Sequence, residues 1–168
     1  LIRCPQRIEK TSMKIPDEVI TIKYGAFSDC TGLTSVTIGK NVTEIEDYAF
    51  QNTSLTEINI PASVSSISSY ALNIPALKRI SVAAGNQSYS SFGGILYNKD
   101  GTTLIMCPQQ IENGSITIPD GVTRIASRAF WDCTGLLSVT LGKSFNAIIE
   151  DNAFERCYSL REIYNYST

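Results

Sequence analysis

The stretch Leu1-Ile2-Arg3-Cys4-Pro5-Gln6 returns later in the chain as Leu104-Ile105-Met106-Cys107-Pro108-Gln109. The two copies lie 103 residues apart, and an ungapped alignment of residues 1–40 with residues 104–143 gives 25 identities in 40 positions. Internal similarity at a fixed spacing is typical of repeat proteins, whose units stack into an elongated solenoid. Because the first copy opens inside a unit, we expect the chain to be part of a longer array.

A shorter repeat lies within the long one and is marked by Ala-Phe dipeptides. They stand at residues 26–27, 49–50, 129–130 and 153–154, with Ala71-Leu72 as a degraded copy. Each dipeptide precedes a Leu-x-x-apolar-x-apolar segment that is usually followed by Gly or Pro. The alternation predicts a strand with one buried face, and the Gly or Pro turns the chain. A Val-x-x-Ile pattern before each dipeptide predicts a second short strand. Acidic pairs such as Glu46-Asp47 and Glu150-Asp151 predict that the Ala-Phe step is a short helical or 3₁₀ turn with acids at its N-terminus.

One step of the short repeat is too long. Ala71 and Ala129 are 58 residues apart, against 22 to 24 residues elsewhere. The excess contains two apolar runs, residues 95–97 and 103–106, that flank Asp100-Gly101, a strong indication of a β-hairpin. We expect the Ser- and Gly-rich residues 85–94 to form a loop. The predicted organisation is one solenoid domain over residues 1–168. It comprises the end of a hairpin coil (1–14), three repeats (15–82), a hairpin-bearing coil (83–117) and two repeats (118–168).

One complete unit and the hairpin segment together carry a family resemblance. The unit reads Ile118-Pro119-Asp120-Gly121-Val122-Thr123-Arg124-Ile125, then Ala129-Phe130, Cys133 and the segment from Leu136 to Leu141. With residues 94–104, it resembles the Treponema-type, BspA-like leucine-rich repeat family. The resemblance implies an α/β, β-rich, right-handed leucine-rich-repeat solenoid of parallel stacked strands, short helical or 3₁₀ turns and an inserted β-hairpin coil. It further implies a bacterial surface or secreted protein at an extracellular location, with members associated with adhesion to host proteins or other cells.

Composition excludes several function classes. The chain has no histidine, which removes Ser-His-Asp, Cys-His and His-based zinc sites. The acidic pairs recur with the repeat, which is unlike a glycosidase pocket. The formal net charge is −2 and the basic residues are dispersed, so we expect no nucleic-acid partner. No apolar run is long enough for a transmembrane segment. We expect no enzymatic activity, no cofactor and no metal.

The five cysteines follow the repeat. Cys4 and Cys107 share one long-repeat position, while Cys30, Cys133 and Cys157 share a short-repeat position. This use predicts small buried side chains with free thiols rather than a disulfide framework. A bond between Cys133 and Cys157 in adjacent coils is the alternative, because a disulfide needs closely spaced Cβ atoms.

The outward positions of the predicted strands form the candidate binding face, because side chains alternate along a strand. They are Ser35, Thr37, Glu57, Asn59, Arg79, Ser81, Ser138, Thr140, Glu162 and Tyr164. Trp131 stands in a column that is polar in the other units, so we expect it to be exposed and consider it a candidate aromatic anchor. Packing between coils is the alternative role for this side chain.

Solenoids bind extended partners through such faces. The leading functional prediction is therefore a non-catalytic protein-protein or adhesion module that binds an extracellular protein or glycan, including host-derived ones. The alternative is a structural spacer, or stalk, that presents another domain and has no ligand of its own. Open strand edges favour pairing, so we also expect end-to-end self-association. It would involve Leu1, Ile2 and Ile8 at one end and Leu160, Ile163 and Tyr164 at the other.

Overall fold

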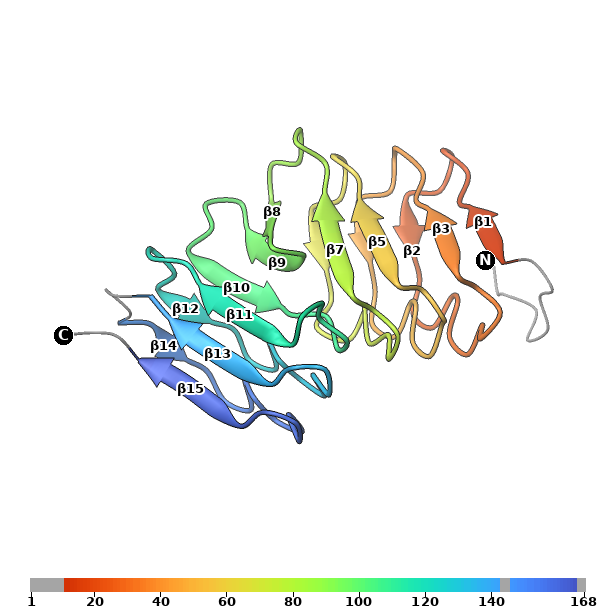
Figure 1. The fold of residues 1–168 in the computed structure, drawn as a ribbon. Helices are drawn as coiled ribbons and strands as arrows, with labels where there is room; N and C mark the ends of the chain where they lie inside the picture. The colour runs from red at the N-terminus through yellow and green to blue at the C-terminus, as the bar shows by residue number, and fades with distance from the viewer. Residues whose placement is uncertain (1–10, 143–145, 166–168) are drawn as a thin grey trace.

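The chain folds into a solenoid whose coils carry two rows of short parallel strands. The computed structural model describes residues 11–142 and 146–165. One row contains β1 (Ser12–Lys14), β3 (Ser35–Thr37), β5 (Glu57–Ile60), β7 (Arg79–Val82), β11 (Ser115–Ile118), β13 (Ser138–Leu141) and β15 (Glu162–Asn165). The other contains β2 (Thr21–Ile22), β4 (Glu44–Ile45), β6 (Ser66–Ile67), β12 (Arg124–Ile125) and β14 (Ile148–Ile149), with β8 (Tyr89–Phe92), β9 (Ile95–Asn98) and β10 (Thr103–Met106) between β6 and β12 in the chain. The strands of the first row lie side by side on the near side of Figure 1.

The long repeat of the sequence is a repeat of the backbone. Advancing β2 (Thr21–Ile22) by 103 residues gives β12 (Arg124–Ile125), and advancing β3 by the same step gives the first three residues of β13. The left-handed residues also correspond, since Gly25 and Arg128 have φ angles of 60° and 59°. The prediction of one shared backbone path is confirmed for the described residues; its first ten positions lie outside them.

The Ala-Phe segments are turns, so the predicted helical turns are wrong. Gly25 and Asp29 flank Ala26-Phe27 with φ angles of 60° and 61°, and a residue in the left-handed region ends a right-handed helix. Because left-handed residues interrupt the right-handed conformation in each turn, every second backbone N–H points toward the next coil. The amides of Gly25, Phe27 and Asp29 donate to the carbonyls of Asp47, Ala49 and Gln51 at 3.1, 2.8 and 2.9 Å. The turns thereby add a third row of hydrogen bonds between coils.

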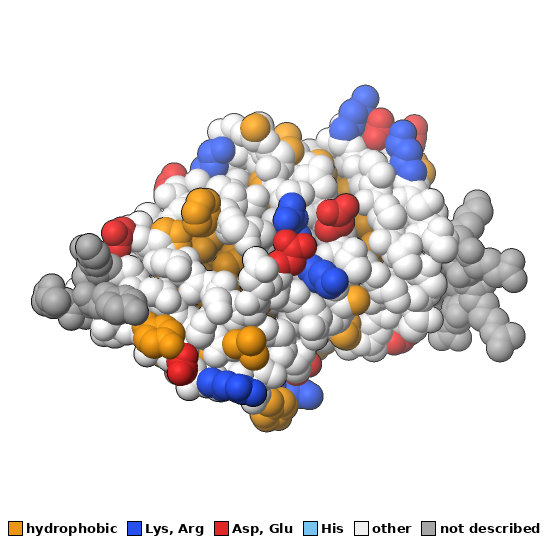
Figure 2. Space-filling model, in the orientation of Figure 1, with side chains coloured by type: hydrophobic (Ala, Val, Ile, Leu, Met, Phe, Trp, Pro, Cys, Tyr) orange, Lys and Arg blue, Asp and Glu red, His pale blue; other side chains and the backbone are white. Residues whose placement is uncertain are grey.

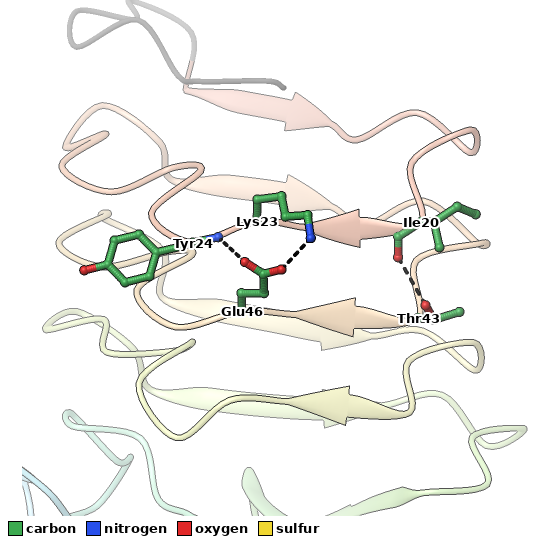
Figure 3. A network of polar contacts seen from close by, with 5 residues as sticks. All are labelled: Ile20, Lys23, Tyr24, Thr43 and Glu46. Atoms are coloured by element: carbon green, nitrogen blue, oxygen red, sulfur yellow. Dashed lines mark hydrogen bonds and ion pairs between the residues drawn. The ribbon is translucent and has the colours of Figure 1, made fainter.

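The acidic residues before the Ala-Phe step also connect coils, and the helix-capping role predicted for them is wrong. Figure 3 shows Glu46 receiving the backbone N–H of Tyr24 at 2.8 Å and the Lys23 ammonium at 2.7 Å, both from the preceding coil. The Lys23 bond is the largest cause that lowers the pKa of Glu46, followed by the Tyr24 bond. Glu150 repeats this arrangement, accepting from Ser127 N–H at 2.8 Å and pairing with Arg124 at 2.9 Å.

The core is divided into two clusters at the hairpin coil. One extends from Ile15 to Leu96, and the other begins at Ile95 and continues into the last coil. Phe27 stacks on Phe50 with ring centroids 5.2 Å apart, and Phe130 stacks on Phe154 at 4.6 Å. The predicted single column of four Phe rings is therefore two stacks of two. Phe130 is fully buried, whereas Phe154, in the last described coil, is half-buried.

The hairpin forms where the sequence predicted it, but its approach is more ordered than predicted. β9 and β10 pair antiparallel around Gly101, whose φ is 70°. Residues 85–94, predicted as a loop, contain β8, which pairs with β9. Asn86 fixes this entry, because its fully buried amide donates to the carbonyls of Pro61 and Val64 and accepts the N–H groups of Ser88 and Tyr89. Because all these hydrogen bonds are made, the buried amide fixes the path of the chain without leaving a polar group unpaired.

Cys30, Cys107 and Cys133 are buried as predicted, and Cys157 is half-buried, while Cys4 lies outside the described residues. Cys107, Cys133 and Cys157 are free thiols. Cys30 is disulfide-bonded, so its predicted free thiol is wrong.

Truncation of Phe130 tests the stacked core. Phe130→Ala should reduce the free energy of unfolding by roughly 3–5 kcal/mol, because it removes a buried ring and leaves a cavity. Phe154→Ala is the matched control and should cost less, since its ring is half-buried. Urea unfolding provides both values, and equal costs would contradict the stacking described above.

Glu46→Gln tests the contact between the first two described coils. The pKa of Glu46 is lowered in the folded chain, so its stabilising effect is present above the unfolded-state pKa and is lost as pH falls through the folded value. The variant should be less stable than the parent at pH 7, and the two should converge at acidic pH. Urea midpoints across this range measure the difference. Glu18→Gln, at an exposed acid outside this contact, should show no such convergence.

Candidate binding surface

The outward side chains of the first row of strands form one open surface, which we call the strand face. Parallel pairing places Glu57 beside Arg79 and Asn59 beside Ser81, and likewise Ser138 beside Glu162 and Thr140 beside Tyr164. Eight of the ten predicted residues are exposed, and Ser138 and Thr140 are half-buried. Figure 2 shows a largely uncharged surface on this side, with a small cluster of both charge signs near its centre. The face is therefore polar but carries little net charge.

The strand face is larger than the sequence prediction. Ser12 and Lys14 of β1 lie beside Ser35 and Thr37, and Ser115 and Thr117 of β11 lie beside Ser138 and Thr140. All four added residues are exposed, and the Ser115 and Ser138 hydroxyls are hydrogen-bonded at 2.8 Å. Ser115-Ile116-Thr117-Ile118 shows the same alternation as the other strands. That pattern could have identified β11, but the altered hairpin unit obscured it.

The strand face is interrupted where the hairpin coil enters the stack. β7 pairs with β5 and contacts β8 and β9, while β11 begins a separate sheet with β13 and β15. A cavity of about 350 Å³, which we call the junction cleft, lies at this break. It is lined by Arg79, Phe92, Gly93, Ile95, Tyr97, Ile111, Glu112, Asn113, Ser115, Ile116 and Thr117. The strands on its two sides run in clearly different directions in Figure 1.

The junction cleft combines an ion pair with an exposed aromatic ring. Arg79 Nη2 lies 2.9 Å from Glu112 Oε2, and both side chains are about half exposed. Phe92 is 67% exposed at the turn between β8 and β9. Tyr97 is buried, its hydroxyl has no hydrogen-bond partner among the residues that the structure describes, and burial raises its pKa to about 12. Aromatic and Arg side chains are the groups that most often dominate binding at interfaces, and both stand here.

Trp131 is half-buried, not openly exposed as predicted. Its ring meets the Tyr70 ring edge-on at 6.2 Å, and the guanidinium groups of Arg128 and Arg156 lie over it at 5.7 and 5.5 Å. These contacts join three coils, since Tyr70, Trp131 and Arg156 come from different units. The ring therefore takes part in packing between coils; its role as a ligand anchor stays a prediction.

A cavity of about 700 Å³ lies beside β2 at one end of the described stack. Its lining includes Ile20, Ile22 and Tyr24. In the second half of the chain, β10 pairs with β12 and covers the residues that correspond to these. The segment equivalent to β10 lies outside the described residues. The cavity therefore borders the face of β2 that corresponds to the β12 edge on which β10 pairs.

The other end of the described stack is also apolar. Ile163 and Tyr164 are 53% and 41% exposed, as predicted, while Leu160 is half-buried. Ile148 and Ile149 of β14 are exposed as well, a feature that the sequence prediction missed. Leu1, Ile2 and Ile8 lie outside the described residues.

Residues 11–142 and 146–165 contain neither a candidate metal centre nor a helix that could cross a membrane. No group of three or more His, Cys, Asp or Glu side chains in this part of the chain could hold a metal ion. The same residues include no helix of the length and apolarity that crossing a membrane requires.

Sequence comparison identifies the family. The model of the BspA-type leucine-rich repeat region matches residues 6–113 and 107–168, with six copies of the repeat. The chain belongs to the BspA-type leucine-rich repeat family. The resemblance stated from the sequence is thereby confirmed, as is the β-rich solenoid fold, although the described residues contain no helix. No curated protein matches this BspA-type chain.

Solved structures of bacterial proteins share the fold. A leucine-rich cell surface protein from Faecalibacterium prausnitzii is 37% identical over 91% of this chain, with a TM-score of 0.75. The pneumococcal vaccine antigen PcpA is 28% identical over 93% of this chain, with a TM-score of 0.79. A leucine-rich repeat protein from Eubacterium ventriosum, 23% identical over 94% of this chain with a TM-score of 0.65, shows the fold alone. The BspA-type chain spans 41%, 39% and 54% of these three proteins.

A double-mutant cycle tests the ion pair of the junction cleft. Because both partners are about half exposed, Arg79→Ala and Glu112→Ala should couple by only about 0.2–1 kcal/mol in the free energy of unfolding. Urea unfolding of the single and double variants measures the coupling, which should decrease at high salt. A coupling of several kcal/mol would mean that the pair holds the two halves together and is not available to a ligand.

Proposed function

We propose that this chain is a non-catalytic binding segment of an exported bacterial protein. On this proposal the chain acts at the cell surface or outside the cell, and the strand face with the junction cleft binds an extracellular protein or glycan. The observation that supports it most is the open, polar surface that β1, β3, β5, β7, β11, β13 and β15 present together. The cell-surface relative from F. prausnitzii, at 37% identity, supports the location.

The junction cleft is the proposed centre of this surface. A uniform row of Ser and Thr side chains offers hydrogen bonds but little specificity, because each group is equally well satisfied by water. The cleft differs in holding Arg79, Phe92 and Tyr97 around one concavity. Concave sites with an apolar floor and a few polar groups bury more of a partner than a flat surface does. Glu57 extends the polar rim on β5, and Glu162 marks the opposite end of the face on β15.

The polar groups of the cleft favour a partner that presents hydrogen-bonding groups of both kinds. Arg79 donates, and the Glu112 carboxylate accepts, so a peptide backbone or a glycan hydroxyl row can complement them together. A partner that depends on strong charge is disfavoured, since the formal net charge is −2 and the two ions neutralise each other locally.

The strand-face variant Glu57→Ala, Arg79→Ala and Glu162→Ala tests the proposal. Its affinity for whichever member of a panel of extracellular-matrix proteins and mucin-type glycans binds the parent chain should fall at least about tenfold, which equals about 1.4 kcal/mol. The thermal midpoint should change little, because exposed strand positions contribute little to folding. Surface plasmon resonance and a thermal melt provide the two readings.

The matched control is Glu18→Ala, Lys40→Ala and Asp100→Ala, which removes the same set of charges from exposed positions outside the strand face. It should leave the affinity unchanged. Equal affinities of both triple variants would refute the strand face as the binding surface. A chain that binds nothing in the panel would support the spacer role instead.

A further inference from the structure

Cys107 and Cys133 form a buried pair of free thiols at the start of the second half of the chain. They are 3% and 0% exposed. The Cys133 thiol lies 3.4 Å from the carbonyl oxygen of Cys107 and 3.5 Å from that of Pro108. A hydrogen bond between the two side chains is the largest cause that raises the pKa of the Cys133 thiol, and burial is the second. The Cys133 sulfur therefore packs directly against Cys107, in the adjacent coil.

The backbone holds the two cysteines in adjacent coils at matching height. The Cys107 N–H donates to the carbonyl of Ala129 at 2.7 Å. In other coils the Ala-Phe phenylalanine makes this bond, as Phe130 does to Ala153 at 2.8 Å. Cys107 thus occupies the phenylalanine position of the hairpin coil, and its side chain points into the core toward the turn that carries Cys133.

The long repeat supplies an independent observation about this pair. Counting back 103 residues from Cys107 and Cys133 gives Cys4 and Cys30. Cys30 is disulfide-bonded. The backbone around Cys30 and Cys133 is the same, since Asp29 and Asp132 have φ angles of 61° and 55° and the flanking strands correspond. A position that supports a disulfide in the first copy is therefore reproduced in the second.

Cys157 has no cysteine at the equivalent position of the coil before it. In the coil before it, the position that Cys107 occupies before Cys133 is filled by Phe130, which has no sulfur. The Cys157 thiol donates instead to the carbonyl of Phe130 at 2.9 Å and is half-buried. This arrangement favours a Cys107–Cys133 bond over the Cys133–Cys157 bond that the sequence left open.

We propose that Cys107 and Cys133 form a disulfide when the chain folds in the presence of a disulfide-bearing oxidant, whether a protein or a small molecule. The Cys107 thiolate attacks the oxidant's disulfide, forms a mixed disulfide and releases one thiolate of the oxidant. The Cys133 thiolate then attacks the Cys107 sulfur and releases the second. Two cysteine thiols are oxidised, one disulfide of the oxidant is reduced to two thiols, and two protons pass from the cysteines to the products.

Because both cysteines are buried in the folded chain, this reaction must occur before the coils finish stacking. Once Cys107 and Cys133 are covered, no oxidant reaches them, so the bond forms during folding and then resists reduction. It would fix the hairpin coil to the next coil at the point where the second core cluster begins.

Peptide mapping of the full chain tests the bond directly. The chain is unfolded, reduced, and refolded in a mixture of oxidised and reduced glutathione; free thiols are then blocked with iodoacetamide under denaturing conditions before trypsin digestion. Cleavage after Lys and Arg places Cys107 in peptide 100–124, Cys133 in peptide 129–143 and Cys157 in peptide 157–161. The expected result is a linked pair of the first two, with peptide 157–161 alkylated.

Peptide 24–40, which carries Cys30, reports that the conditions are oxidising. If it is disulfide-linked while peptides 100–124 and 129–143 are both alkylated, the proposal is wrong. A linked pair of peptides 129–143 and 157–161 would overturn it equally.

Variants provide a second reading. In oxidised protein, Cys107→Ser, Cys133→Ser and the double variant should lower the thermal midpoint by the same amount, on the order of 5–10 °C, because each removes the same cross-link. When the chain is unfolded and refolded in the presence of reductant, the parent should lose most of this advantage. Cys157→Ser should change the midpoint equally with and without reductant. Midpoints of the Cys107 and Cys133 variants that do not depend on redox state would contradict the bond.

Discussion

The hydrogen bonds between coils at the Ala-Phe turns set the geometry on which the rest of the solenoid depends. Two left-handed residues in each turn alternate the direction of the backbone, so that Gly25, Phe27 and Asp29 all donate to the next coil. With two rows of parallel strands, this gives each coil three lines of contact with its neighbour. The step between coils is thereby fixed, and side chains of equal size stack at equal heights. The paired Phe rings and the interlocking Glu46 and Glu150 contacts follow from that fixed step.

The hairpin coil breaks this regularity, and the break places a cleft in the middle of the strand face. β8, β9 and β10 widen the second row of strands without adding to the first, so the strand face divides between β7 and β11. The junction cleft, the Arg79–Glu112 pair and the exposed Phe92 all lie at that division. A regular stack of coils would have produced a smooth polar surface, whereas the inserted hairpin creates a cleft in the middle of the strand face.

The sequence was sufficient for the strands, the repeat and the hairpin, because these follow from alternation, spacing and the Asp100-Gly101 turn. The sequence did not predict the conformation of the Ala-Phe turns. Left-handed φ values occur there at Tyr48, Arg128 and Asn152, and these residue types do not indicate the end of a helix. β8 was missed because Ser and Gly dominate its neighbourhood. Its order depends on the Asn86 amide, which donates to the carbonyls of Pro61 and Val64 and accepts from the N–H groups of Ser88 and Tyr89. The candidate strand face followed from periodicity. The junction cleft could not be predicted, because it joins Arg79 to residues 33 positions later through the bend of the chain.

The stacking of coils also determines how such a protein carries load. The hydrogen bonds that join coils point along the stacking axis, so tension applied at the two ends acts on every inter-coil contact in series. Each contact yields separately, and a released coil of about 23 residues lengthens the chain by roughly 80 Å. A solenoid pulled from its two ends would therefore lengthen in steps while its remaining coils stay folded.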